Sequence, residues 1–118
     1  MMNVGSLTVI LAAFGVMGGV GLSDLTISPP PGDASSGKTI YSSLCARCHG
    51  VDGTGHGMMS FTPPVADLTS PAVQNKLDAG LFKRIHEGKP NTAMGAWRSA
   101  LSDEEIWDVL AYLRTLAQ

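Results

Sequence analysis

Cysteine is scarce in this chain of 118 residues, and the sequence contains no basic run and no strand-like alternation of polar and apolar residues. Its two cysteines, Cys45 and Cys48, are too few for a structural zinc site or an iron–sulfur cluster, which normally takes about four Cys or His ligands. Eight Lys and Arg against ten Asp and Glu give a formal net charge of -2, which argues against nucleic-acid binding. What remains is one small domain with a hydrophobic segment ahead of it.

Both cysteines belong to one pentapeptide, Cys45-Ala46-Arg47-Cys48-His49, which has the spacing of a c-type haem attachment site. Two thiols on one turn of chain can bond to the two vinyl groups of a single porphyrin, and the adjacent imidazole is then held beneath the iron. A redox-active dithiol uses the same Cys-x-x-Cys spacing. That dithiol is expected in a βαβ pattern, however, and the strand signals are missing. The sequence therefore predicts one covalently bound haem c.

An uncharged segment of 19 residues, 4–22, would be about 28 Å long as a helix at roughly 1.5 Å per residue. Because a hydrocarbon core is about 30 Å thick, we expect residues 1–23 to form a transmembrane anchor. The alternative is a secretory signal peptide cut near Ser23. The lack of Lys and Arg ahead of the segment argues against a signal peptide, whereas its glycines weaken a helix. If the four-residue spacing of Gly15 and Gly19 is more than coincidence, this helix packs against subunits of a membrane complex.

Residues 24–36 have the Pro, Gly and Ser content of a short linker, and the haem domain is expected over residues 37–118. A helical pattern over residues 37–44 runs directly into the pentapeptide. The four glycines within residues 50–57 indicate a loop. The domain therefore starts with a helix that leads straight to the haem segment.

Three more helices are expected further along the chain. A short one over residues 71–77 precedes a second one that Asp78 caps and Gly88 ends. The last helix has the clearest signals, because Ser102 and Glu105 form a capping box. Its apolar stripe recurs at helical spacing and indicates a core helix: Ile106, Val109, Leu110, Leu113 and Leu116.

The second axial ligand of the iron has three candidates. Met94 lies in an irregular loop 45 residues after His49, which leaves room for the chain to pass around the haem. A thioether in that position would complete a His/Met pair. Met58 and Met59 are the rivals, but they follow the attachment segment so closely that the opposite face of the haem is harder to reach. The rigid pair Pro63-Pro64 could present a backbone carbonyl to the free ring nitrogen of His49.

Three blocks of the sequence together resemble a class I cytochrome c domain of a bacterial electron-transfer system. They are the segment that leads from Gly37 and Tyr41 into the pentapeptide, the segment Ala93-Met94-Gly95-Ala96-Trp97, and the end of the last helix. The resemblance implies a small all-α fold over residues 37–118, in which the first and last helices cross near-perpendicularly over a covalent haem. It also implies that Gly37 admits Tyr112 at the crossing.

The resemblance further assigns roles to individual residues. Cys45 and Cys48 would form thioethers, and His49 and Met94 would ligate the iron. Pro63 or Pro64 would supply the carbonyl to His49, and the remaining residues expected to contact the haem are Tyr41 and Trp97. Gly95 departs from the family pattern, because many relatives have proline after the methionine, and this puts the stiffness of the loop in doubt.

These assignments predict an electron-transfer protein and not an enzyme, since a six-coordinate iron has no vacant position for a substrate. The expected partners are a redox donor and a redox acceptor, together with membrane-complex subunits of a respiratory or photosynthetic system. The haem domain is expected on the periplasmic side of the bacterial cytoplasmic membrane. Two alternatives remain open: a periplasmic cytochrome that diffuses freely after signal cleavage, and a haem enzyme or gas sensor with a labile sixth ligand.

Overall fold

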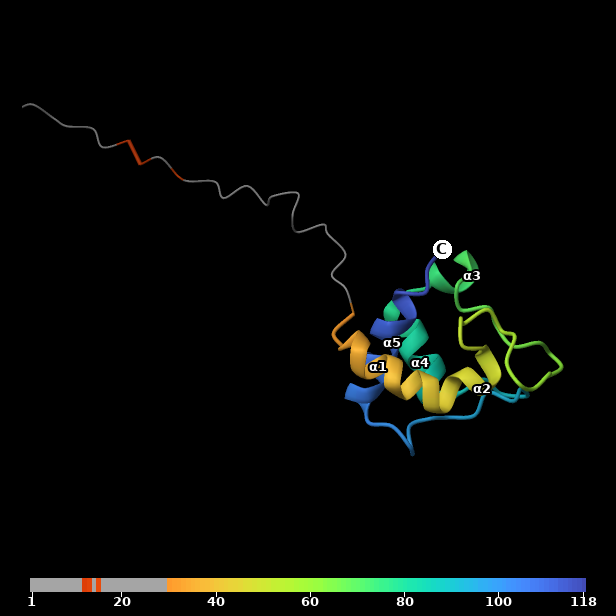
Figure 1. Ribbon diagram of the computed structural model, residues 1–118. Helices are drawn as coiled ribbons and strands as arrows, with labels where there is room; N and C mark the ends of the chain where they lie inside the picture. Colours follow the sequence, from red (N-terminus) through yellow and green to blue (C-terminus); the bar gives the residue numbers. More distant parts are fainter. Residues whose placement is uncertain (1–11, 14, 16–29) are drawn as a thin grey trace, which may run out of the picture.

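The computed structural model describes residues 12, 13, 15 and 30–118, and among these residues the regular elements are all helices (Figure 1). The expected all-α fold is therefore confirmed. No helix in this part of the chain is long and apolar enough to cross a membrane. The predicted anchor, residues 1–23, lies outside the described residues apart from positions 12, 13 and 15.

One helical run leads from the start of the domain to the haem motif. It consists of α1 (Ala34–Ile40), the π-helical turn η2 (Tyr41–Cys45) and α2 (Ala46–His49). The run begins three residues before the predicted start, because Asp33 caps it by accepting a hydrogen bond from the Ser35 N–H at 2.9 Å. The π turn adds one residue to the helix, so the Ala46 N–H donates to the Tyr41 carbonyl five residues back. The sequence pattern did not predict this turn.

The first and last helices form the core of the domain. The last one, α5 (Asp103–Arg114), has the predicted capping box between Ser102 and Glu105. Four residues of the predicted apolar stripe are buried, and Ile106 and Leu110 among them are 0% exposed. The fifth, Leu116, lies beyond the end of α5 and is partly buried against the core. In Figure 1, α1 crosses α5 and continues through η2 towards the far end of the domain.

Gly37 lies where α1 touches α5. A side chain at this position would overlap the backbone of Asp108 and Val109. The atoms nearest to Gly37 are therefore backbone atoms of α5, and not the ring of Tyr112 that the family resemblance implied. The Tyr112 ring packs instead one helical turn further along, on the Tyr41 ring, with 5.2 Å between the ring centroids.

Two helices lie between the haem motif and α5. α3 (Pro71–Gln74) is shorter than the predicted 71–77, and α4 (Asp78–Glu87) ends at Gly88 as predicted. Asp78 does not cap α4; Leu77 occupies that position. The physical reason is that the Asp78 carboxylate accepts a hydrogen bond from Arg114 Nε at 2.9 Å, which ties the start of α4 to the end of α5.

Candidate haem-binding site

A cavity of about 290 Å³ lies beside α2, between α4, α5 and the two long loops. Every residue that the sequence assigned to the haem lines this cavity: Tyr41, Cys45, Cys48, His49, Pro63, Pro64, Met94 and Trp97. Most of the remaining wall is apolar, with residues from both loops and four helical elements: Leu44, Phe61, Val65, Leu68, Val73, Leu81, Ile85, Leu101, Val109 and Leu113. Segments far apart in the sequence thus build one largely apolar chamber.

The two cysteine thiols reach the cavity from one short piece of helix. Burial raises the pKa of the Cys45 thiol to about 11, with a smaller contribution from the neighbouring Cys48. A redox-active dithiol needs a thiol whose pKa is lowered, so that the nucleophilic thiolate forms near neutral pH. The raised pKa and the all-helical surroundings therefore argue against the dithiol alternative.

His49 is oriented by a backbone carbonyl. Its Nδ1 lies 3.2 Å from the Ala66 carbonyl oxygen. Because a carbonyl can only accept, Nδ1 carries the proton and donates it, which leaves the lone pair on Nε2 available for a metal. Burial lowers the pKa of His49, and this also favours the neutral ring.

The partner carbonyl belongs to Ala66 and not to Pro63 or Pro64, so the expectation from the sequence was wrong by two residues or more. Both prolines line the cavity, where their rings form part of the wall. A backbone carbonyl leaves no mark in the sequence, since any residue can supply one. No residue-type signal could have identified Ala66.

The loop that carries Met94 is held by backbone hydrogen bonds on both sides. The Lys89 N–H donates to the Met94 carbonyl at 2.9 Å, and the Trp97 N–H donates to the Ile85 carbonyl at 3.1 Å. Gly88, with φ of 71°, lets the loop pass close to the end of α4, because a side chain there would overlap the backbone of residues 94–96. These anchors fix the loop although Gly95 replaces the proline found in many relatives.

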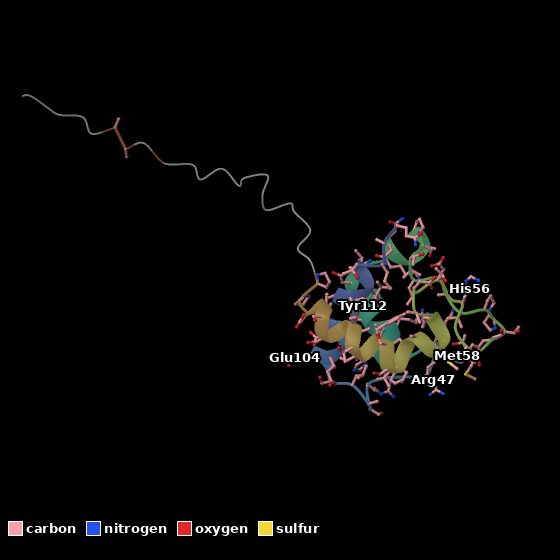
Figure 2. All side chains as sticks on the ribbon, viewed as in Figure 1. Arg47, His56, Met58, Glu104 and Tyr112 are labelled. Carbon is pink, nitrogen blue, oxygen red and sulfur yellow. The ribbon has the colours of Figure 1, made fainter. Side chains whose placement is uncertain are left out.

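The rival methionines do not line the cavity. Met58 is 88% exposed and Met59 is 52% exposed, whereas Met94 is partly buried against the core. Figure 2 shows the Met58 side chain at the surface near Arg47. Of the three methionine candidates, Met94 alone reaches the chamber that holds the thiols and His49.

Tyr41 closes the chamber from behind the haem motif. Its side chain is 1% exposed, and its hydroxyl donates to the Gly50 carbonyl at 2.6 Å. This bond joins the π turn to the residue that follows His49. The polypeptide on both sides of the two thiols is thereby fixed relative to α1.

Three cations also line the cavity, and none of them is among the residues that were expected to contact the haem. They are Lys76, Arg84 and Lys89, which come from the segment after α3, from α4 and from the loop that follows it. No acidic side chain is among the described residues that form the wall.

The thiol pair, the imidazole with a free Nε2, the thioether and the apolar wall fit a haem c held by two covalent bonds. The family described as cytochrome C oxidase, cbb3-type, subunit III matches residues 32–113. The chain belongs to this family of c-type cytochromes. It accordingly carries one covalently bound haem c, for which Cys45 and Cys48 have the required spacing.

Several known proteins resemble this cytochrome. Cytochrome c-554(547) of Halothiobacillus neapolitanus is 37% identical over 92 residues, which are 72% of this chain and 98% of that protein. Thiosulfate dehydrogenase of Allochromatium vinosum is 33% identical over 107 residues, which are 85% of this chain but 37% of that protein. The solved structure of cytochrome c6 from the diatom Phaeodactylum tricornutum matches with a TM-score of 0.58 and 31% identity, covering 73% of this chain and 95% of that chain. This similarity supports an electron-carrying c-type cytochrome.

Proposed function

We propose that the cytochrome is a one-electron carrier in which His49 Nε2 and the Met94 thioether would together hold the haem iron. The observation that carries this proposal is that both side chains line one apolar cavity together with the two thiols. When bound, the haem supplies reversible one-electron chemistry at its iron. Because the two side chains would leave no position on the iron for a substrate, the arrangement favours a carrier over an enzyme.

The residues of the chain have distinct tasks in this proposal. Cys45 and Cys48 hold the cofactor covalently. The Ala66 carbonyl keeps the proton on Nδ1 of His49, so that Nε2 always faces the metal as a lone pair. The backbone hydrogen bonds on both sides of Met94 would hold its thioether in place beside the cavity. A fixed ligand set keeps the reorganisation that accompanies electron transfer small.

The ligand assignment is tested by adding carbon monoxide to the reduced protein and following visible absorption. We expect no rapid binding in the unmodified protein and rapid binding in Met94→Ala, because that variant opens one axial position. Met58→Ala is the matched control, since Met58 is exposed and does not line the cavity. Rapid binding of carbon monoxide by the unmodified protein would refute the carrier and favour a gas sensor or a haem enzyme.

We also propose that the cytochrome works at the periplasmic face of the cytoplasmic membrane, held by residues 1–23, as a subunit or partner of a redox complex. The family description, which names a subunit of a cbb3-type oxidase, supports this. Cytochrome c-554(547), which this chain spans almost completely, supports the freely diffusing alternative. Membrane fractionation with haem staining and mass measurement separates the two: a soluble haem protein that begins near Asp24 would exclude the anchor.

A further inference from the structure

Two side chains fasten one part of the cavity wall to the end of α5. This part, which we call the wall segment, is residues 68–78 and runs through α3 to the start of α4. Three of its residues line the cavity: Leu68, Val73 and Lys76. In Figure 1 the C-terminal end of the chain lies beside α3, and the hydrogen bonds that join the two places come from Gln74 and Arg114.

The Gln74 amide joins the wall segment to α5. Its Nε2 donates to the Leu68 carbonyl at 2.8 Å and to the Leu113 carbonyl at 2.9 Å. A side-chain amide nitrogen has two hydrogens, so both of its donors are used. Because Leu68 and Leu113 both line the cavity, this one group fixes two parts of the wall relative to each other.

The Arg114 guanidinium holds three further positions of the wall segment. It donates to the Gln74 carbonyl at 2.7 Å from Nη1, to the Lys76 carbonyl at 2.6 Å from Nη2 and to the Asp78 carboxylate at 2.9 Å from Nε. Only arginine has donors that point in several fixed directions from one planar group. We call Gln74 and Arg114 the clamp.

The wall segment depends on the clamp for its position. α3 is a single turn of four residues, too short to be stable by itself. Within residues 30–118, Val73 is the one residue of α3 that packs against the core cluster, and no other hydrogen bond joins α3 to α5. Lys76 lines the cavity and is also exposed to solvent, so the wall there is no thicker than one stretch of chain. A small outward movement of this stretch would admit water.

We infer that Gln74 and Arg114 are positioning residues that keep water away from the haem and thereby raise its reduction potential. Neither is among the described residues that line the cavity, so both act through the wall. The shell around a metal centre controls solvent access and with it the potential. Ferric haem carries one more positive charge than ferrous haem, so water in the cavity would favour the ferric form. The inference goes beyond the proposed function, because it requires the haem and not the role of carrier.

The charge of Arg114 offers a competing explanation that has to be separated from its position. The guanidinium is paired with the Asp78 carboxylate, and their side chains are 21% and 27% exposed. Removal of Arg114 alone would leave that carboxylate unpaired and would change the potential through charge. Gln74→Met avoids this difficulty, because methionine is close to glutamine in size, lacks both donors and changes no charge.

The test measures the reduction potential of the haem-loaded full-length protein by spectroelectrochemical titration. We expect the equilibrium constant for reduction to fall several-fold in Gln74→Met, where a tenfold fall would be about 59 mV for one electron. Hydrogen exchange of the backbone amides of residues 68–78, followed by mass spectrometry, should become faster in the same variant. Asn75→Met is the matched control, because the side chain of Asn75 is exposed and makes no hydrogen bond within residues 30–118. It should change neither measurement.

An unchanged potential in Gln74→Met, or an equal fall in Asn75→Met, would overturn the inference. A fall without faster exchange would also overturn it, since the wall would then not have moved. Arg114→Lys keeps the charge but not the fork of donors, and it should lower the potential as well. If it keeps the potential that Arg114→Met loses, charge explains the effect and the clamp is refuted. The carrier is judged separately, by carbon monoxide binding to the unmodified protein.

Discussion

Replacement of Gly37 by alanine tests the contact on which the domain is built. A Gly to Ala change inside a helix normally stabilises by about 1 kcal/mol, because alanine is the better helix former. At Gly37 the added methyl group would overlap the backbone of Asp108 and Val109, which cannot rotate away as a side chain could. Overpacking of this kind costs about 1–3 kcal/mol or more. We therefore expect a net loss of about 2 kcal/mol in the free energy of unfolding.

Gly80→Ala is the matched control. Gly80 lies in α4, and a methyl group there would meet nothing within 4 Å apart from the backbone of its own helix and its chain neighbours, so the same substitution should stabilise by up to about 1 kcal/mol. Urea titration of the two haem-loaded variants, followed by far-ultraviolet circular dichroism, measures the difference. On heating, about 1 kcal/mol corresponds to roughly 4–8 °C in Tm for a domain of this size. If Gly37→Ala is as stable as Gly80→Ala, the close backbone contact between α1 and α5 does not exist.

Two further predictions concern the helix that carries the haem motif. Tyr41→Phe removes the bond to the buried Gly50 carbonyl, which keeps its second bond from the Gly53 N–H at 3.2 Å. It should therefore lower the free energy of unfolding by about 0.5–1.5 kcal/mol, the net contribution of one hydrogen bond. Tyr112→Phe, whose hydroxyl makes no hydrogen bond within residues 30–118, should change it by less than about 0.5 kcal/mol in the same urea titration. Deletion of Ser43 removes the extra residue of the π turn and would rotate the thiols by about 100° relative to α1. We therefore expect the deletion variant to lose its covalent haem on a haem-stained denaturing gel, whereas Ser43→Ala should retain it. Haem retained in the deletion variant would contradict the role of the turn.

The features that the sequence predicted well are those with a local signal. The capping box at Ser102 and Glu105 identified the start of α5, and Gly88 identified the end of α4. The Cys-x-x-Cys-His spacing predicted the cofactor, which the family match confirms. The axial role of Met94 remains a prediction, although the loop in which it lies was placed correctly beside the cavity.

The features that the sequence did not predict depend on contacts across the fold. Asp78 has the residue type of a helix cap, but Arg114 lies 36 residues away and draws its carboxylate elsewhere. The π turn starts at Tyr41, whose hydroxyl bonds to the Gly50 carbonyl, and no periodicity reveals either the turn or the bond. The partner of His49 is a main-chain atom of Ala66. In each case the deciding partner is distant, or is an atom that every residue possesses.

Two of the hydrogen bonds that fasten the loop after the haem motif involve His49. The His49 carbonyl accepts from the Gly55 N–H at 2.7 Å, and the ring donates to Ala66. The stretch between these points includes an exposed tip, residues 58–60, and the prolines of the cavity wall. Insertions or substitutions in this stretch can therefore reshape the wall while the imidazole keeps its orientation. The fold allows the haem environment, and with it the reduction potential, to be varied separately from the ligation of the iron.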